Sequence, residues 1–456
     1  MQRRLLQELM NWKGSQKRKP LLLEGARQVG KTYLLEELFG KGHYESVIRV
    51  NFEKADSELF NLFKGNIEPK RIISYLSMRE NMPINQNRTL IIFDEIQELP
   101  RALTSLKYFS EEAPEYHIAA TGSLLGIALH SGSSFPVGKV DRLRLYPMDL
   151  EEFYWALGMK SQTDEARDAI ENHRSPLFSS LFRDAFQQYL AIGGMPASVS
   201  EWIENNNINT VESILKNIIS DYRDDFSKHT TNSESRKIAN IWRTIPNQFA
   251  KENHKFVYKT VEPSARNRDY AFALDWLIDA GLVYKVDIVA HGDKLPLSFY
   301  ANATDFKVYT LDVGLLRRLT NLHSMVVMGE DNIWSNFGGV FAEQFVLQQL
   351  RSLGFNEAFY WAGSADNPLQ PKGKSELDFI VSLNDQIIPI EVKSGFNVKA
   401  QSLRVYRNKY NPGLSIRFSL KNLEYNEGLL NIPLYYSFLL KDLINLRDNL
   451  KLFPNY

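Results

Sequence analysis

The chain has 456 residues, and at about 150 residues per domain this length predicts roughly three domains. Its 54 Lys and Arg residues balance its 54 Asp and Glu residues, so no overall positive charge favours nucleic-acid binding, and any such site must be a local patch. The absence of cysteine excludes disulfides, thiolate catalysis and cysteine-bound zinc. No apolar run of about 18 residues and no signal-peptide pattern occur, which predicts a cytoplasmic protein with no membrane partner.

Residues 21–39 predict a buried strand, a loop and a helix, because three leucines precede the loop and apolar residues recur at helical spacing after it. The loop fits the pattern G-x-x-x-x-G-K-[ST] at every fixed position. Its glycines let the backbone approach a phosphate, its lysine carries charge to the β- and γ-phosphates of ATP, and its threonine hydroxyl can bind Mg²⁺. The predicted ATP-binding residues of this loop are Gly25, Ala26, Arg27, Gln28, Val29, Gly30, Lys31 and Thr32.

An apolar stretch about 62 residues further along, residues 89–94, ends in two adjacent carboxylates. Its continuous apolar character is typical of a central parallel strand. Asp94 is predicted to hold Mg²⁺ through water, together with Thr32, and Glu95 is predicted to act as the catalytic general base on the attacking water. The alternative is an ordinary strand that ends at an acidic cap.

Residues 116–123 predict the neighbouring strand, which ends in hydroxyl side chains. Thr121 and Ser123 are predicted to bind the nucleotide, where they can contact the γ-phosphate or the attacking water. Ser123 can equally cap the helix that follows it. The alternation of strands and helices predicts a parallel sheet with helices on both faces and the ligand at the carboxyl ends of the strands.

These motifs, in this order, resemble those of the AAA-type P-loop ATPases of bacteria and archaea. They are more closely similar to a subgroup that carries an uncharacterised C-terminal domain with a nuclease-like end. The resemblance is tight over residues 1–155 and looser afterwards. It implies an arginine finger at Arg142 or Arg144, and a solvated surface position is the alternative for either residue. The stretches that carry the resemblance are residues 25–32, 93–97, 120–123 and 138–153.

In the middle of the chain, residues 159–180 predict a loop or lid insertion, and residues 181–192 predict a helix that ends at a Gly-Gly-Met-Pro turn. This turn resembles the helical lid of the same family, and a helix break with glycine caps is the alternative. Helices followed by strands at 281–289, 297–300 and 306–312 form the pattern of a winged helix.

Four basic side chains lie near the recognition helix and wing that this pattern predicts, which permits contact with DNA. Acidic residues are mixed with them, so a solvated surface or a protein interface is the alternative. The basic residues are Arg266, Arg268, Lys285 and Lys294.

Residues 375–395 predict a hairpin, since two apolar strands flank an Asn-Asp turn. Asp378 lies in the first strand, and Glu391 and Lys393 lie two residues apart on one face of the second. Asp, twelve residues and then Glu-x-Lys is the pattern of the PD-(D/E)xK nucleases, in which two carboxylates bind Mg²⁺ and the lysine orients and activates water. All three residues are therefore predicted to be catalytic. A surface hairpin with a Glu–Lys ion pair is the alternative.

A predicted helix upstream of the hairpin carries Glu343, which matches the helix carboxylate that often completes such nuclease sites. The chain departs from the family pattern at Leu377, which stands where a proline is expected. The predicted metal ligands of the C-terminal site are Glu343, Asp378 and Glu391.

Two later stretches complete the prediction. A helix over residues 402–410 carries Arg404 and Arg407, which suit a phosphate backbone or solvent equally. Residues 434–439 predict the last strand, and a final helix follows it.

The predicted fold class is α/β, with a P-loop NTPase parallel sheet and helical lid, a middle winged-helix-like domain and a C-terminal α/β domain that resembles restriction endonucleases. The predicted domains are residues 1–155 for the AAA-type ATPase core, 156–205 for the lid, 206–325 for the winged-helix-like domain and 326–456 for the nuclease-like domain.

The predicted function is ATP hydrolysis with ATP and Mg²⁺ as cofactors, coupled to a C-terminal nuclease-like module that cleaves or binds nucleic acid. The predicted partners are DNA or another nucleic acid, and protein partners or further copies of the chain. The alternative is an ATP-switched binding or regulatory protein whose nuclease-like domain is catalytically inactive.

Overall fold

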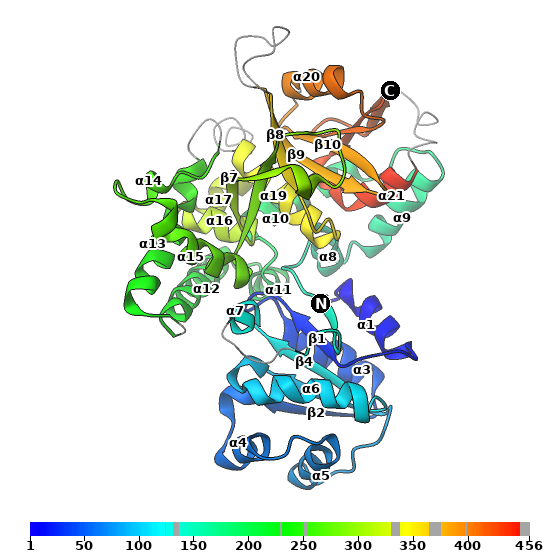
Figure 1. Ribbon diagram of the computed structural model, residues 1–456. Helices are drawn as coiled ribbons and strands as arrows, with labels where there is room; N and C mark the ends of the chain where they lie inside the picture. Colours follow the sequence, from blue (N-terminus) through cyan, green and yellow to red (C-terminus); the bar gives the residue numbers. More distant parts are fainter. Residues whose placement is uncertain are drawn as a thin grey trace. The chain divides into compact units, whose positions relative to one another are not determined.

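The structure is a computed structural model that divides into two compact units (Figure 1). The first comprises Met1–Pro147 with Trp276–Leu282, and the second comprises Met148–Asp275 with Val283–Tyr456. None of the helices in the described residues combines the length and the apolar character that a membrane span requires. The residues described are 1–123, 125–130, 136–228, 230–249, 254–329, 338–363, 375–396 and 399–446.

The first unit is built on a five-stranded, fully parallel sheet in the order β2-β3-β4-β1-β5. All residues of β3 and β4 are buried, as expected for central strands that are covered on both faces. This sheet confirms the predicted α/β class. Its strands are β1 (Leu21–Glu24), β2 (Ser46–Asn51), β3 (Thr89–Asp94), β4 (His117–Gly122) and β5 (Asp141–Arg144).

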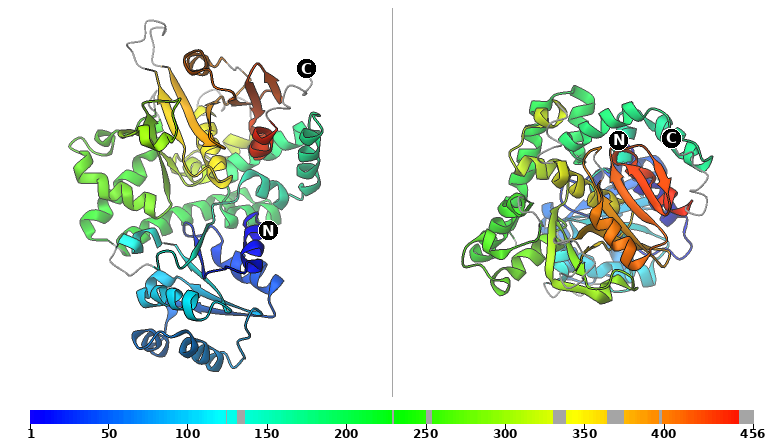
Figure 2. Two further views of the ribbon diagram at one scale, coloured as in Figure 1. Left: turned by 45° about the vertical axis from the view of Figure 1, so that its right-hand side comes forward. Right: turned by 90° about the horizontal axis from the view of Figure 1, so that it is seen from above.

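Helices lie on both faces of this sheet (Figures 1 and 2). Ile91 and Phe93 of β3 join a core with residues of α4, α5 and α6, while Leu90 and Ile92, which alternate with them, are also fully buried. The helices of this unit are α1 (Leu5–Gly14), α2 (Lys31–Tyr33), η1 (Leu34–Gly40), α3 (Lys41–His43), η2 (Phe52–Lys54), α4 (Ser57–Lys64), α5 (Pro69–Arg79), η3 (Ile96–Glu98), α6 (Pro100–Glu112) and α7 (Leu125–His130).

The second unit contains an eight-stranded mixed sheet in the order β12-β13-β11-β10-β9-β8-β6-β7. Leu403 and Tyr406 of α20 pack into one core with residues of β8 and β9, such as Trp361 and Ile380. The strands are β6 (Val283–Val289), β7 (Ala301–Thr310), β8 (Phe359–Ala362), β9 (Glu376–Leu383), β10 (Gln386–Val392), β11 (Ser415–Ser419), β12 (Glu424–Asn426) and β13 (Leu429–Pro433).

The helices of the second unit come from residues 150–445. α15 carries residues of both units. The helices are α8 (Leu150–Ala156), α9 (Lys160–Glu171), α10 (Ser179–Ile192), α11 (Pro196–Asn205), α12 (Ile208–Lys228), α13 (Asn232–Phe249), α14 (Tyr258–Val261), α15 (Asn267–Asp279), η4 (Leu297–Tyr300), α16 (Val313–Leu319), α17 (Ser324–Gly329), α19 (Gly338–Ser352), α20 (Gln401–Tyr410), η5 (Leu434–Leu439) and α21 (Leu440–Asn445).

The strands expected to form the wing of a winged helix belong to this large sheet. β6 pairs with β7 on one side and with β8 on the other. A free strand edge readily accepts another strand, and here β8 of the C-terminal region covers the edge of β6. The predicted boundary between residues 325 and 326 therefore divides elements of one sheet. Residues 156–205, expected as a lid on the ATPase core, likewise group with the second unit.

Two expected strands are short 3₁₀ helices instead. Residues 297–300 follow Pro296 and form η4, and residues 434–439 follow Pro433 and form η5. All residues of η5 are buried, and a short buried apolar run does not by itself distinguish a strand from a helix.

Residues 57–79 form two helices, because Gly65 ends α4 and Pro69 starts α5. Residues 160–171 lie in the stretch expected as a loop or lid insertion, and they form α9, which buries a stripe of small and apolar side chains at helical spacing.

The Gly-Gly-Met-Pro turn packs inside the second unit. A Cβ on Gly193 would lie 2.2 Å from Asp312 Oδ1, and one on Gly194 would lie 2.0 Å from the carbonyl oxygen of Met148. The backbone N–H of Gly194 donates to Asp312 Oδ2 at 2.7 Å, and Gln348 Nε2 donates to the same oxygen at 3.0 Å. These glycines are therefore explained by close packing against a buried carboxylate.

Candidate active sites

The phosphate loop connects β1 to α2 with a backbone that requires glycine at both ends. Gly25 has a φ of 150° and Gly30 a φ of 93°. A Cβ on Gly25 would lie 2.3 Å from the carbonyl oxygen of Leu145, next to the end of β5. The chain can make this turn only without side chains at these positions, which agrees with the sequence pattern.

Lys31 is held inside this loop at its helical end. Its Nζ donates to the carbonyl oxygens of Gly25 at 2.9 Å and Ala26 at 2.8 Å, and 6% of the residue is exposed. Burial lowers the pKa of Lys31 to about 8, although Glu95 and Asp94 act against this change. The ammonium is bonded to neutral carbonyls, so a phosphate would provide the anionic partner that it lacks there.

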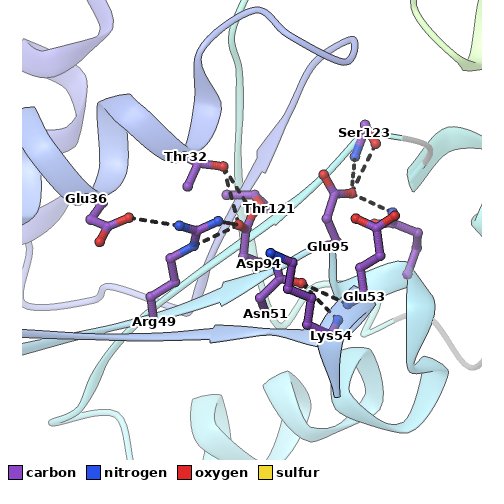
Figure 3. Close-up of polar contacts among 11 residues, drawn as sticks. Thr32, Glu36, Arg49, Asn51, Glu53, Lys54, Asp94, Glu95, Thr121 and Ser123 are labelled. Carbon is purple, nitrogen blue, oxygen red and sulfur yellow. Dashed lines mark hydrogen bonds and ion pairs between the residues drawn. The ribbon is translucent and has the colours of Figure 1, made fainter. Parts of the chain in front are cut away.

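Asp94 lies at the carboxyl end of β3 and gathers side chains from three neighbouring elements (Figure 3). Thr32 Oγ1 donates to Asp94 Oδ1 at 3.2 Å, and the Thr121 hydroxyl donates to the same oxygen. Arg49 of β2 donates to Asp94 Oδ2 from Nε at 2.9 Å and from Nη2 at 2.6 Å. Arg49 Nη1 also reaches Glu36 Oε2 at 3.2 Å.

Arg49 is a residue of this site that the sequence prediction missed, and Gln97 beside Glu95 is another. The available signal is that Arg49 is the one charged residue in the sequence of β2. Asn51, two residues later on β2, is paired in register with Asp94. Side chains two residues apart share one face of a strand, so an arginine at this position could have been expected near Asp94.

Glu95 has a separate set of partners from Asp94, although the two are adjacent in sequence (Figure 3). Its backbone is left-handed, with φ 51° and ψ 49°. Its Oε2 accepts hydrogen bonds from Ser123 Oγ at 3.0 Å and Gln97 Nε2 at 2.7 Å. Ser123 therefore contacts the predicted general base. Its alternative role as a helix cap involves residue 124, which lies outside the described residues.

The two arginine-finger candidates lie on β5 and share one acidic partner. Arg144 Nη2 is 3.3 Å from Glu24 Oε2, and Arg142 Nε is 3.7 Å from Glu24 Oε1. About half of each arginine side chain is exposed. A finger role for either residue stays a prediction.

In the second unit, β9 and β10 form the predicted hairpin. Asn384 and Asp385 both have positive φ, 49° and 59°, which is the conformation of a tight hairpin turn. The backbone N–H of Val392 donates to Asp378 Oδ2 at 2.7 Å, so Asp378 lies beside the second strand. Lys393 Nζ is 2.6 Å from Glu391 Oε1.

The two carboxylate oxygens of Glu391 differ in their partners. Oε1 pairs with Lys393, whereas Oε2 is buried and has no hydrogen-bond partner among the described residues. A buried carboxylate oxygen without a partner is costly, so this atom is suited to a bound cation.

Glu343 of α19 binds side chains that the sequence prediction did not include. Its Oε2 accepts hydrogen bonds from Tyr309 Oη at 3.1 Å and His254 Nδ1 at 3.2 Å. Lys307 Nζ lies 3.8 Å from the same oxygen and 2.7 Å from Glu376 Oε1. A lysine inside the buried half of β7 was the available sequence signal, because a buried charge requires a partner.

The carboxylates of this site differ in their pKa values. Burial raises the pKa of Asp378 well above its usual value, and nearby Glu343 and Glu391 add to the effect. Burial also raises the pKa of Glu391. Burial alone would raise the pKa of Glu343, but Lys307 and His254 hold it at about 2.

The residues present fit a divalent cation at Asp378 and Glu391. Mg²⁺ is commonly bound by one or two carboxylates, with water and phosphate oxygens completing its coordination. A cation at this point would give the free oxygen of Glu391 a partner, and its charge would offset the effects that raise the pKa values of Asp378 and Glu391. Within the described parts of the chain, no group of three or more His, Asp or Glu side chains is arranged to hold a metal ion.

The other predicted basic residues have varied surroundings. Arg266 and Arg268 line an open cavity of about 570 Å³ with two further basic residues, Arg236 and Lys237, and two acidic ones, Glu262 and Asp269. Lys285 pairs with Asp287 at 2.8 Å, and Lys294 lies over the ring of Tyr300. Arg407 donates to the carbonyl oxygen of Glu427, and Arg404 lies on the same helix, α20.

Comparisons with known proteins give family matches for three segments of the chain. Residues 17–154 match the family model described as "AAA domain". This match supports the predicted AAA-type ATPase over residues 17–154. Residues 183–325 and 338–436 match two domains of unknown function, DUF8612 and DUF4143. No curated protein matches the chain.

Several solved structures are similar to parts of the chain at low identity. The Walker-type ATPase of Pyrococcus abyssi is 15% identical, with a TM-score of 0.43, over 69% of this chain and 94% of that one. A structure of Drosophila ORC bound to AT-rich DNA and Cdc6 is 14% identical, with a TM-score of 0.20, over 70% of this chain and 90% of that one. Such low TM-scores define no shared fold, so the ATPase assignment depends on the family match.

Proposed function

We propose that the chain is a Mg²⁺-dependent ATPase whose nucleotide cycle is coupled to a metal-dependent, nuclease-like site in the second unit. The observation that carries the ATPase half is the separation of Asp94 from Glu95. Asp94 contacts Thr32 and Thr121, whereas Glu95 contacts Ser123 and Gln97. Two adjacent carboxylates are thereby available for two different tasks.

In this mechanism the loop residues bind and orient the triphosphate. Backbone N–H groups of the loop and the Lys31 ammonium would bind the phosphates, and Thr32 and Asp94 would hold Mg²⁺. When bound, Mg²⁺ supplies positive charge against the charge that develops on the phosphate oxygens. Glu95 orients the attacking water and accepts its proton, while Ser123 and Gln97 fix the direction of the Glu95 carboxylate.

The test of the ATPase half is Glu95→Gln, which keeps the shape of the side chain but removes its basicity. We expect ATP hydrolysis to fall by about 10²- to 10⁴-fold, the range of a general base, while ATP still binds. The exposed neighbour Glu98 provides the matched control, and Glu98→Gln is expected to hydrolyse ATP at the parental rate. Parental hydrolysis by the Glu95 variant would contradict the assignment.

The nuclease-like half is supported by the positions of Asp378, Glu391 and Lys393. The two carboxylates would hold the divalent ion, and Lys393 would orient the water that attacks a phosphodiester. Single-stranded and duplex DNA and RNA are the substrates to test, with and without ATP and with Mg²⁺ or Mn²⁺. We expect Asp378→Asn and Lys393→Met to abolish metal-dependent cleavage and to leave ATP hydrolysis unchanged.

A second candidate function is ATP-switched binding of nucleic acid without cleavage. The cavity that Arg236, Lys237, Arg266 and Arg268 line favours it, because grouped basic side chains suit a phosphate backbone, although Glu262 and Asp269 line the same cavity and reduce its positive charge. Binding of duplex DNA that weakens with salt, without cleavage under any metal condition, would support this candidate. Metal-dependent cleavage that is lost in Asp378→Asn would exclude it.

A further inference from the structure

A buried lysine lies among the carboxylates of the C-terminal site. Lys307 is 2% exposed, and its Nζ is 2.7 Å from Glu376 and 3.8 Å from Glu343. Its ammonium also lies 5.2 Å from the centre of the Tyr360 ring. The ammonium is held by these two carboxylates, so the lysine places a buried positive charge inside the site.

Lys307 and its neighbours also engage the carboxylate of Glu343. Its Oε2 receives hydrogen bonds from Tyr309 and His254 and also faces Lys307. A carboxylate oxygen that is engaged in this way has little remaining capacity for a metal ion. The buried Oε2 of Glu391, by contrast, has no partner among the residues that the structure describes.

The two parts of this site come from different segments of the sequence. Lys307 and Tyr309 lie in the segment that matches DUF8612, whereas Glu343, Asp378 and Glu391 lie in the segment that matches DUF4143. β7 carries Lys307 and is joined to β9 and β10 through β6 and β8 in one sheet. The positive charge is thus built into the same sheet as Asp378 and Glu391.

We propose that Lys307 takes the role of a second divalent ion, so that the C-terminal site binds a single divalent ion at Asp378 and Glu391. Glu343 is then the counter-ion of Lys307 rather than a metal ligand. This inference rests on the proposed metal-dependent site and deepens it. Two-metal sites place two cations about 3.5–4 Å apart, and a fixed ammonium within such a cluster repels a second cation.

The test is the number and affinity of Mn²⁺ ions bound by the full chain without nucleotide, measured from the electron paramagnetic resonance signal of free Mn²⁺. An Asp94→Asn background removes the carboxylate of the ATP site. We expect one bound Mn²⁺, which is lost in Asp378→Asn. Lys307→Gln is expected to bind a second Mn²⁺ or to bind the first at least about tenfold more tightly, because it removes a nearby positive charge.

Lys255 supplies a matched control, since its Nζ lies 6.0 Å from the centre of the same Tyr360 ring but pairs with Asp305. Lys255→Gln and Lys307→Arg are both expected to keep one ion with affinity within about threefold of the parental value. If circular dichroism shows that Lys307→Gln does not fold, Lys307→Gln with Glu376→Gln removes the pair together. Its gain in Mn²⁺ affinity is expected to be in the same direction but smaller, because the loss of the more exposed Glu376 offsets part of the loss of Lys307.

Two Mn²⁺ ions in the parental C-terminal site, or none, would overturn the inference. Unchanged Mn²⁺ binding by a folded Lys307→Gln variant would also overturn it. Failure of the protein to cleave any nucleic acid would instead count against the nuclease-like half of the proposed function. It would not affect the inference that the site binds one ion, which the Mn²⁺ measurement tests separately.

Discussion

Two buried lysines, Lys31 in the first unit and Lys307 in the second, differ in what surrounds their charge. Lys31 donates to two neutral carbonyl oxygens, and burial lowers its pKa to about 8. Lys307 lies beside carboxylates that raise its pKa in spite of burial. The first charge is left for a ligand to balance, whereas the second is already balanced within the protein.

This difference gives a physical criterion for the role of a buried lysine. A lysine whose own contacts are neutral gains a partner when an anion binds, so its interactions strengthen with the ligand. A lysine that is already paired changes little when an anion arrives, and its main effect is on the charges around it. By this criterion Lys31 contributes binding energy for a phosphate, and Lys307 sets the charge of the site at Asp378 and Glu391.

The largest expected effect tests the first side of this comparison. Lys31→Ala is expected to weaken ATP binding by at least about thirtyfold, since loss of a buried charge contact costs about 2 kcal/mol or more. Titration with a fluorescent ATP analogue measures it. Lys41 lies at the exposed end of the same helical run and pairs with Glu37, so Lys41→Ala is the control and should bind ATP normally. Parental ATP affinity in Lys31→Ala would contradict the role of Lys31 in binding the phosphates.

The second prediction uses the raised pKa values of Asp378 and Glu391. Because folding favours their protonated forms, the stabilisation that they give is complete below about pH 4, the usual carboxyl pKa, and is lost as pH rises through their raised pKa values. In a metal chelator, the free energy of unfolding should therefore fall with rising pH, by at most about 1.4 kcal/mol per pH unit for each group.

Urea unfolding at a series of pH values from about 4.5 to 8 measures this slope. Asp378→Asn should reduce the slope, and added Mn²⁺ should reverse it because the ion binds the deprotonated pair. Asp385→Asn, in the exposed hairpin turn, is the matched control and should keep the parental slope. An equal slope in parental protein and Asp378→Asn would show that this carboxyl is not shifted by its surroundings.

The sequence predicts the first site more completely than the second for a physical reason. Residues 25–32 form one contiguous segment, the loop and the start of α2, and the motifs that end β3 and β4 lie at the carboxyl ends of neighbouring parallel strands. Parallel strands align these ends automatically, so the contacts of Thr32, Thr121 and Asp94 follow from the order of the motifs.

The second site depends on pairings between distant segments. The turn residues Asn384 and Asp385 are a local signal, and they predict the hairpin that brings Asp378 close to Glu391. Lys307 lies 71 residues before Asp378 on a strand that the sequence pattern assigns to another domain. Its place in the site follows only from the strand order of the large sheet, and no local pattern encodes that order.

The smallest expected effect concerns Arg49, a residue of the first site that lies outside the sequence motifs. Arg49 donates twice to Asp94 Oδ2, the carboxylate predicted to hold Mg²⁺ through water. The arginine and the ion therefore compete for Asp94. Arg49→Met is expected to lower the Mg²⁺ concentration for half-maximal ATP hydrolysis by about threefold, a modest change because the side chain is 36% exposed and water weakens the pair.

Hydrolysis at saturating ATP over a range of Mg²⁺ concentrations measures the effect of Arg49→Met. Arg88 pairs with Glu45 at 3.1 Å on the surface, so Arg88→Met is the matched control and should leave the Mg²⁺ dependence unchanged. A higher Mg²⁺ requirement in Arg49→Met would mean that the arginine orients Asp94 toward the ion rather than competing with it. In that case Arg49, like Lys307, would be a fixed cation that shapes a carboxylate for metal binding, and the two sites would be more alike than their lysines indicate.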